Sequence, residues 1–484
     1  MDVTSDEEVK AVYEQIQKDL TQNGEQLWAV VNNAGILTLG PLDWGTVDTY
    51  KLIFEVNTFG MVRVSRTFLP LIRQSKGRIV NLVSMAGRLT PENLGIYSMS
   101  KHAAISFSDG LRRETRKWGI KVSTIEPTAY KTPMAGPDYF TRELEKQWNE
   151  SSDDVKQLYG QAYYEHFKQR KDRLTVAKTG KNIYEVIDKI IDAIRSPNPQ
   201  IRYVAVPGKA YNKIAIFLAQ LMPLEIYDSI FAHKSTREPK PSGLQRLSLD
   251  FWVTAKMSLT KIFSLKCFIT QYILAFLGLY LAVNVSCCFG GLVSWVGRMF
   301  VVSALAWGLT KKIRKRLNKE FLTSFVVSAL AWGLTKKIRK RLNKEFLTSY
   351  KRAVLVTGCD SGFGNALALK LNEHGFRVYA TVLDTESEGA KKLISGQRFE
   401  GKTKVVRMDV TSDEEVKAVY EQIQKDLTQN GEQLWAVVNN AGIITLGPLD
   451  WGTVDTYKRI FEVNTFGMVR VSRTFLPLIR QSKG

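Results

Sequence analysis

The sequence predicts an α/β protein whose doubly wound parallel sheet is split over two partial copies that a membrane segment joins. Apolar strands alternate with helical stretches over residues 1–235 and again over 351–484. Residues 1–77 return at 408–484 with two changes, Leu37 to Ile444 and Leu52 to Arg459. A run of 31 residues between the two pieces, 267–297, carries no charged side chain. A repeat this long and this exact is not the short, drifting repeat of a solenoid.

The first piece, residues 1–235, is expected to alternate strands and helices. The expected strands are 27–33, 77–84, 120–127 and 201–208, and the expected helices are 8–20, 46–71 and 97–118. Strands that are apolar throughout indicate a parallel sheet covered on both faces. Right-handed crossovers between such strands give a doubly wound fold.

The middle of the chain is predicted to be a linker, 236–260, followed by a membrane anchor, 261–350. The uncharged run exceeds the ~20 residues that cross a bilayer once, so it forms either one long span or a hairpin. Residues 300–324 return unchanged at 325–349. Fifteen Lys or Arg residues and two Glu residues lie within 298–352, which explains much of the net charge of +21. A basic collar beside a membrane accounts for this charge better than a nucleic-acid groove does, so no nucleic-acid partner is expected.

The second piece, residues 351–484, opens with a strand at 353–356, a glycine-rich turn and a helix to residue 373. The following strands are expected at 377–382 and 404–410. Glycines between a strand and a helix let the backbone approach a pyrophosphate at the helix N-terminus, although a plain tight turn also needs them. The turn residues expected to hold the cofactor are Gly358, Ser361, Gly362, Phe363 and Gly364. Asp384 near the end of the next strand favours NAD without excluding NADP, although it is also a candidate for a solvated loop residue.

A candidate acid–base group lies in the first piece. Ser84 ends a predicted strand, Tyr97 follows thirteen residues later, and Lys101 lies one helical turn after Tyr97. An ammonium near a phenol favours the phenolate, which suits Tyr97 to general acid–base work. The Ser84 hydroxyl can donate a hydrogen bond to a substrate oxygen. The cysteines, Cys267, Cys287, Cys288 and Cys359, have no metal-ligand spacing, so no metal site is expected.

Taken together, these motifs resemble the short-chain dehydrogenase/reductase family, and in particular its membrane-associated members that act on retinol, hydroxysteroids or D-β-hydroxybutyrate. The phrases TFLPLIRQSKGRIVN (67–81) and VLVTGCDSGFG (354–364) carry the strongest similarity. The resemblance implies a Rossmann-type fold, an NAD(P) cofactor, roles in steroid or lipid metabolism, and a location in the membrane of the endoplasmic reticulum or in the mitochondrial inner membrane. The basic collar predicts that the catalytic pieces face the cytoplasm. A homo-oligomer is also possible.

The same resemblance implies a role for each matching residue. Tyr97 would be the general acid–base, and Lys101 would tune it and bind the nicotinamide ribose. Ser84 would polarise the carbonyl, and Asn57 would hold a water of the proton relay. The residues implied to line the cofactor are Asn33, Ala34, Gly35, Pro127, Thr132 and, beside the adenine, Asp2 or Asp409. Thr128 stands where the family usually has glycine.

The two pieces are incomplete in complementary ways. The first lacks a glycine turn, and the second ends before any counterpart of Ser84. Residues 351–407 followed by 1–235 would make one conventional domain, but 408–484 would then compete with 1–77 for the same place in the sheet. Two functions are therefore open. The chain is either an oxidoreductase acting on a secondary alcohol such as a hydroxysteroid, retinoid-like alcohol or 3-hydroxy acid, or a non-catalytic membrane protein from fused partial paralogues. The aromatic segment 137–180 either lines a substrate pocket or forms a helical core.

Overall fold

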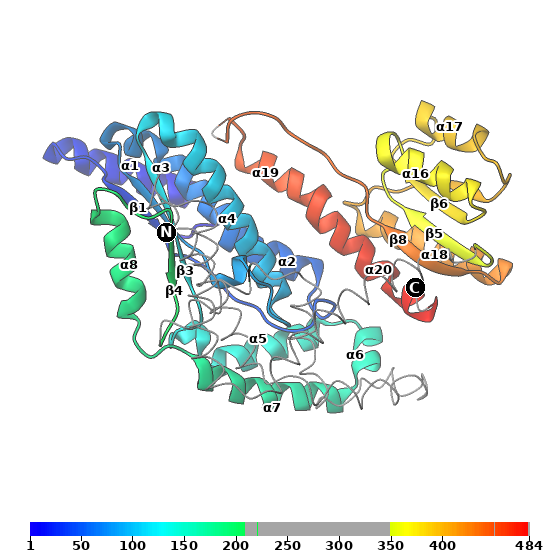
Figure 1. Ribbon diagram of the computed structural model, residues 1–484, viewed down its shortest axis with the longest axis horizontal. Helices are drawn as coiled ribbons and strands as arrows, with labels where there is room; N and C mark the ends of the chain where they lie inside the picture. Colours follow the sequence, from blue (N-terminus) through cyan, green and yellow to red (C-terminus); the bar gives the residue numbers. More distant parts are fainter. Residues whose placement is uncertain (209–219, 221–348, 450, 483–484) are drawn as a thin grey trace, which may run out of the picture. The chain divides into compact units, whose positions relative to one another are not determined.

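The computed structural model describes residues 1–208, 220, 349–449 and 451–482 (Figure 1). The linker, the uncharged run and all of the basic collar except residues 349–352 lie outside the described residues. The described residues contain two four-stranded parallel sheets, in the strand orders β1-β2-β3-β4 and β7-β6-β5-β8. The prediction of two partial α/β copies with parallel sheets is therefore confirmed.

The first sheet is covered by helices on both faces (Figure 1). Its strands are β1 (Ala29–Asn32), β2 (Arg78–Leu82), β3 (Lys121–Pro127) and β4 (Arg202–Ala205). Helix α8 packs on one face through Val186 and Ala193, while α3 and α4 pack on the other. The helices around this sheet are α1 (Asp6–Asn23), α2 (Val47–Phe54), α3 (Met61–Ser75), α4 (Gly95–Thr115), α5 (Pro137–Glu150), α6 (Asp153–Tyr159), α7 (Gln161–Lys178) and α8 (Tyr184–Arg195).

The helix expected over 46–71 is interrupted by one turn of π-helix. Thr46 caps α2, and its hydroxyl accepts a hydrogen bond from the backbone N–H of Thr49 at 3.2 Å. The π-helical turn then runs from Glu55 to Gly60 before α3 begins. Such turns often occur at functional sites. Here the π-helical turn carries Asn57, whose side chain is fully buried.

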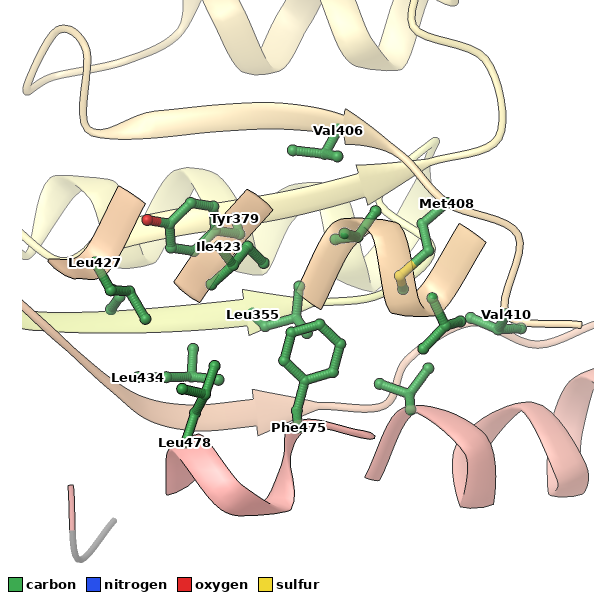
Figure 2. Packing of buried hydrophobic residues seen from close by; sticks show 14 residues of the cluster. Leu355, Tyr379, Val406, Met408, Val410, Ile423, Leu427, Leu434, Phe475 and Leu478 are labelled. Atoms are coloured by element: carbon green, nitrogen blue, oxygen red, sulfur yellow. The ribbon is translucent and has the colours of Figure 1, made fainter. Parts of the chain in front are cut away.

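The second sheet has its own core. Its strands are β5 (Arg352–Val356), β6 (Arg377–Val382), β7 (Thr403–Arg407) and β8 (Gln433–Val438), and its helices are α16 (Gly362–Glu373), α17 (Glu388–Ser395), α18 (Asp413–Asn430), α19 (Val454–Phe461) and α20 (Met468–Ser482). A second π-helical turn, Glu462–Gly467, joins α19 to α20. Helices α18 and α20 cover one face, where Phe475 and Ile423 pack against Leu355 and Tyr379 (Figure 2). Helices α16 and α17 cover the other face.

The two copies of the duplicated segment do not compete for one position, because each copy places its strand in a different sheet. Strands β1 and β8 are copies of the same strand, since residues 29–33 and 436–440 share the sequence AVVNN. Strand β1 pairs with β2, and β8 pairs with β5. The one-domain arrangement of 351–407 with 1–235 is therefore not formed. Each sheet ends on its own copy of the duplicated strand.

None of the helices in the described part of the chain combines the length and apolar character needed to cross a bilayer. The predicted membrane segment, 261–350, falls almost wholly among residues that the structure does not describe.

Candidate active site

Ser84 lies just beyond the carboxyl end of β2, where the chain turns toward α4. Its backbone is extended, and its hydroxyl caps a short 3₁₀ turn by accepting a hydrogen bond from the Ala86 N–H at 3.1 Å. The same hydroxyl donates to the Pro127 carbonyl at 3.4 Å. Ser84 is therefore held between the ends of β2 and β3, the edge at which parallel α/β sheets bind their ligands.

Tyr97 and Lys101 project from the first turns of α4 toward Ser84. The Lys101 Nζ lies 5.7 Å from the centre of the Tyr97 ring and donates to the Leu82 carbonyl at 3.4 Å. Burial raises the pKa of Tyr97 to about 12, and a hydrogen bond with the Ser84 hydroxyl opposes that rise. Burial lowers the pKa of Lys101 to about 8. The structure thus brings Ser84, Tyr97 and Lys101 together with a neutral phenol at pH 7.

Asn57 and the Lys101 Nζ both lie close to Gly35. The Asn57 Oδ1 accepts from the Ile36 N–H at 2.8 Å, and its Nδ2 donates to the Ile36 carbonyl at 2.9 Å. Gly35 fits between these groups: an added Cβ would lie 3.3 Å from the Asn57 Oδ1 and 3.4 Å from the Lys101 Nζ. Asn57 therefore positions the loop after β1 and leaves little room for a side chain at residue 35.

A buried amide network that the motifs did not indicate supports this site. The Asn32 Nδ2 donates to the Ser65 hydroxyl at 2.9 Å and to the Asn81 Oδ1 at 2.8 Å. The Asn81 Nδ2 in turn donates to the Ser108 hydroxyl at 2.8 Å. Two strands and two helices are thereby joined below the site. Asparagines inside otherwise apolar strands were the available signal, because buried amides need partners.

A buried ion pair joins the turn after Ser84 to β3. The Arg88 Nη2 lies 2.9 Å from the Glu126 Oε1, and the Arg88 Nε donates to the Glu126 Oε2 at 3.3 Å. Glu126 is 1% exposed and also accepts from the Thr124 hydroxyl at 2.9 Å. This two-point contact fixes the segment that carries Ser84 against the strand that ends at Pro127. The sequence motifs did not indicate this ion pair either.

The glycine turn follows β5 in the second sheet. Gly358 has φ +65°, and a Cβ there would lie 2.7 Å from the Ala441 Cα. Gly364 is equally confined, since its Cβ would meet the Asn440 Nδ2 at 2.4 Å. Ser361 caps α16 without a side-chain hydrogen bond, and Phe363 is 91% exposed. The first turn of α16 therefore presents backbone N–H groups beside an open glycine turn.

The glycine turn is fixed by the second copy of the NNAG motif. The Asn440 Nδ2 donates to the carbonyls of Thr357 and Gly358, each at 2.9 Å. The Thr357 hydroxyl accepts from the N–H groups of Asn440 and Ala441, each at 3.0 Å. Asn440 and Ala441 are the duplicates of Asn33 and Ala34. Asn33 and Ala34 themselves follow β1 in the first sheet, whereas the glycine turn follows β5 in the second sheet, so a shared role in cofactor binding stays a prediction.

Asn33 and Ala34 are exposed at the end of β1. Asp384 is also exposed, just beyond β6, and its Oδ1 accepts from the Glu386 N–H at 2.9 Å. The Asp409 Oδ1 accepts from the N–H and the hydroxyl of Thr411, each at 2.8 Å, and Asp2 makes the equivalent contacts with Thr4.

The two residues expected beside the nicotinamide lie near the end of β3. Pro127 ends that strand, and Thr132 precedes the short turn Pro133–Ala135. Both are partly buried. Pro127 is joined to Ser84 by the hydrogen bond described above, so it lies at the same sheet edge as Ser84, Tyr97 and Lys101.

The aromatic residues of segment 137–180 mostly form a core. Trp148, Tyr164 and Phe167 pack around Trp44, and Trp148 stacks on Tyr164 with ring centroids 4.9 Å apart. This packing supports the helical-core interpretation for these three residues. Tyr139 differs, because its hydroxyl donates to the Leu37 carbonyl at 2.9 Å, in the loop that follows Gly35.

Among the residues that the structure describes, no group of three or more His, Cys, Asp or Glu side chains could hold a metal ion. Cys359 is fully buried, and burial raises the pKa of its thiol to about 12. A thiol with so high a pKa stays protonated and unreactive at neutral pH.

Comparison with known proteins gives one consistent result. The family model described as short chain dehydrogenase matches residues 1–142 and 352–484. The chain is 35% identical over 244 residues to a 3β-hydroxysteroid dehydrogenase of Caenorhabditis elegans, and 39% identical over 246 residues to the human 17β-hydroxysteroid dehydrogenase type 2. Each match covers 50% of this chain and 62% or 61% of the relative, so less than two thirds of either relative is spanned.

A solved short-chain dehydrogenase/reductase from Burkholderia phymatum, in complex with NAD, is 23% identical to the chain. The likeness covers 49% of this chain and 77% of that one, with a TM-score of 0.37.

Proposed function

Because the chain belongs to the short-chain dehydrogenase family, we propose that it is an NAD(P)-dependent oxidoreductase that interconverts a secondary alcohol and its carbonyl. The observation that carries the proposal is the convergence of Ser84, Tyr97 and Lys101 at one sheet edge. A phenol with a raised pKa beside a hydroxyl and a buried amine is suited to proton transfer at a carbonyl oxygen.

In the reducing direction, the Ser84 hydroxyl turns from its 3.4 Å contact with the Pro127 carbonyl, donates its hydrogen bond to the substrate oxygen and polarises the carbonyl. The Tyr97 phenol gives its proton to that oxygen as the carbon becomes tetrahedral. Lys101, with a pKa of about 8, stabilises the resulting phenolate and can return a proton to it near neutral pH. A nicotinamide cofactor, when bound, would supply the hydride in this direction and would accept it in the other. In oxidation, the Tyr97 phenolate takes the proton of the alcohol.

The glycine turn fits a dinucleotide. Side chains at Gly358 and Gly364 would collide with the second copy of the NNAG motif, so the backbone stays bare where a pyrophosphate would approach. The N-terminus of α16 supplies N–H groups and a positive dipole end. Asp384 offers a carboxylate near the position where an acidic residue accepts a hydrogen bond from the ribose hydroxyl of NAD. A carboxylate at this position favours NAD over NADP.

One observation favours a second candidate function. The glycine turn belongs to the second sheet, whereas Tyr97 belongs to the first. A chain that keeps this arrangement would bind a dinucleotide without catalysing turnover, as expected of a non-catalytic protein from fused partial paralogues.

The two candidates are separated by measuring cofactor binding and turnover on the same purified full-length chain. NADH binding is followed by fluorescence, and turnover is measured with a hydroxysteroid, a retinoid alcohol and 3-hydroxybutyrate. The oxidoreductase predicts saturable binding and turnover that Tyr97→Phe lowers by at least about 100-fold while NADH affinity is unchanged. Tyr184→Phe, at a side chain 67% exposed, is the matched control and should leave both unchanged. Binding without turnover would support the second candidate, and no saturable binding would refute both.

We also propose that residues 261–350 attach the chain to a membrane and so favour a lipophilic substrate. The support is the uncharged run of 31 residues and the basic collar that follows it. Flotation of the expressed chain with liposomes after alkaline carbonate extraction tests this. Recovery of the chain in the soluble fraction would contradict membrane attachment without affecting the proposed chemistry.

A further inference from the structure

The duplicated helices contact one another within the chain. Phe54 and Phe59 of the first copy pack against Phe461 and Phe466 of the second. Phe54 lies 5.4 Å from Phe461 and 5.3 Å from Phe466 between ring centroids, and Phe59 lies 5.5 Å from Phe461. Three of these four rings are no more than 2% exposed. The contact is therefore a desolvated aromatic core and not a surface touch.

The ion pairs beside this core are reciprocal. The Lys51 Nζ lies 3.1 Å from the Glu462 Oε1, and the Lys458 Nζ lies 3.0 Å from the Glu55 Oε2. Lys458 and Glu462 are the duplicates of Lys51 and Glu55, each 407 positions later in the chain. The second ion pair is thus the first with the two copies exchanged.

A second reciprocal pair of contacts lies further along the helices. The Arg66 Nη1 donates to the Leu449 carbonyl at 3.1 Å. The Arg473 Nη1, which belongs to the duplicate of Arg66, donates to the Leu42 carbonyl at 3.3 Å, and Leu42 is the counterpart of Leu449. Both the lysine–glutamate ion pairs and the arginine–carbonyl hydrogen bonds therefore occur twice, with the two copies exchanged. Such reciprocal contacts are the property of an isologous, two-fold interface.

The acceptors of the ion pairs are oriented by buried arginines. The Arg63 side chain is 2% exposed, and its Nη2 donates to the Glu55 Oε1 at 2.9 Å. Arg470 makes the same contact with Glu462 at 3.0 Å. Each glutamate is thus fixed by its own copy and faces the lysine of the other. Preorganised charges of this kind fix the register of an interface.

We propose that residues 47–75 form a two-fold interaction surface whose occupant is the chain's own duplicate, residues 454–482. The second copy plays the part of a partner subunit, so this face is closed to another molecule of the same chain. Only one of the two sequence differences between the copies falls on these helices, at Leu52, which is 48% exposed, and Arg459. The four charged residues and four phenylalanines that make the contact are unchanged.

Zero-length carbodiimide cross-linking of the full-length chain tests the proposal. The reagent joins a lysine to a carboxylate that already touches it, so it should form the Lys51–Glu462 and Lys458–Glu55 amides. Trypsin distinguishes the copies by mass spectrometry because it cleaves after Arg459 and not after Leu52. Both cross-links are expected in the denatured band of a single chain, 54.8 kDa. Their occurrence only in a band of twice that mass, or their absence, would overturn the proposal.

Charge reversal supplies the specificity control. Lys51→Glu should abolish the cross-link to Glu462 and leave the Lys458–Glu55 cross-link intact, and adding Glu462→Lys should restore the amide with its donor and acceptor exchanged. Lys10→Glu reverses an exposed lysine that pairs with Glu14 inside α1, and it should leave both interface cross-links unchanged. Failure of the double variant to regain the cross-link would show that Lys51 and Glu462 do not face each other in solution.

Discussion

Replacing Lys101 with methionine is expected to stabilise the folded chain at neutral pH. Lys101 is 4% exposed, and burial lowers its pKa from 10.5 to about 8. A tenfold change in a protonation equilibrium corresponds to about 1.4 kcal/mol, so keeping the buried ammonium costs the folded state roughly 3 kcal/mol. Methionine has a similar length and no charge, so Lys101→Met should recover most of that free energy.

The gain should depend on pH with a definite sign. Below pH 8 both the folded and the unfolded chain hold the Lys101 proton, and the full cost is present. Between about pH 8 and 10.5 the unfolded chain holds the proton and the folded chain releases it, so the stability of the natural chain rises with pH. The advantage of Lys101→Met should therefore be largest at pH 7 and nearly absent above pH 10.5.

The gain in the free energy of unfolding is measured by urea unfolding at pH 7 and at pH 10. Hydrogen exchange of peptides from β2 and α4 reports the unfolding of the region around Lys101. A gain of roughly 3 kcal/mol at pH 7 corresponds to a rise of about 6–12 °C in the midpoint of thermal unfolding for a domain of this size. Lys10→Met, at an exposed lysine of α1, is the control and should show no such dependence on pH. A gain that is the same at both pH values, or a loss at pH 7, would refute the assignment of Lys101 as a buried cation that burial destabilises.

Three further predictions follow from the geometry. Gly358→Ala should abolish NADH binding and lower stability, because the new Cβ would lie 2.7 Å from the Ala441 Cα. The control, Gly401→Ala, has a similar φ of +72° and open space around it, so it should cost only about 1 kcal/mol of stability and leave NADH binding intact. Equal losses of stability for the two variants in calorimetry would contradict the close approach at Gly358. Ser84→Ala should raise the pKa of Tyr97 further, because the hydrogen bond with the Ser84 hydroxyl lowers it. Alkaline absorbance titration measures this pKa, and a lower pKa in the variant would contradict the prediction. Phe54→Ala, at a side chain 1% exposed, should cost about 3–5 kcal/mol in urea unfolding, and a loss below about 1 kcal/mol would show that the ring does not lie in a packed core.

The strands and the proximity of Ser84, Tyr97 and Lys101 could be predicted because both depend on local patterns. Apolar runs bounded by turns placed β2, β3, β5 and β6 within a few residues of their observed bounds. The four-residue step from Tyr97 to Lys101 requires both side chains on one helix face, and the helix is present. Neither inference depends on which parts of the chain meet in space.

The partition into two sheets could not be predicted from the same patterns. Strands β1 and β8 carry the same residues, so neither hydrophobicity nor propensity decides which of them pairs with β5. The π-helical turn at Asn57 and the Arg88–Glu126 pair also escaped notice. The first depends on the packing of one helix segment, and the second joins residues 38 positions apart that the strand crossover brings together.

The two duplicated strands make the pairing of β5 a choice between nearly degenerate partners. Along the chain, β8 is less than a quarter as far from β5 as β1 is, and loop-closure entropy favours the nearer strand by only roughly 1 kcal/mol. Exchange of β8 for β1 beside β5 would unite the glycine turn and Tyr97 in one continuous sheet. Only the pairing of β5 with β1 would place the residues proposed for cofactor binding and those proposed for proton transfer in the same sheet.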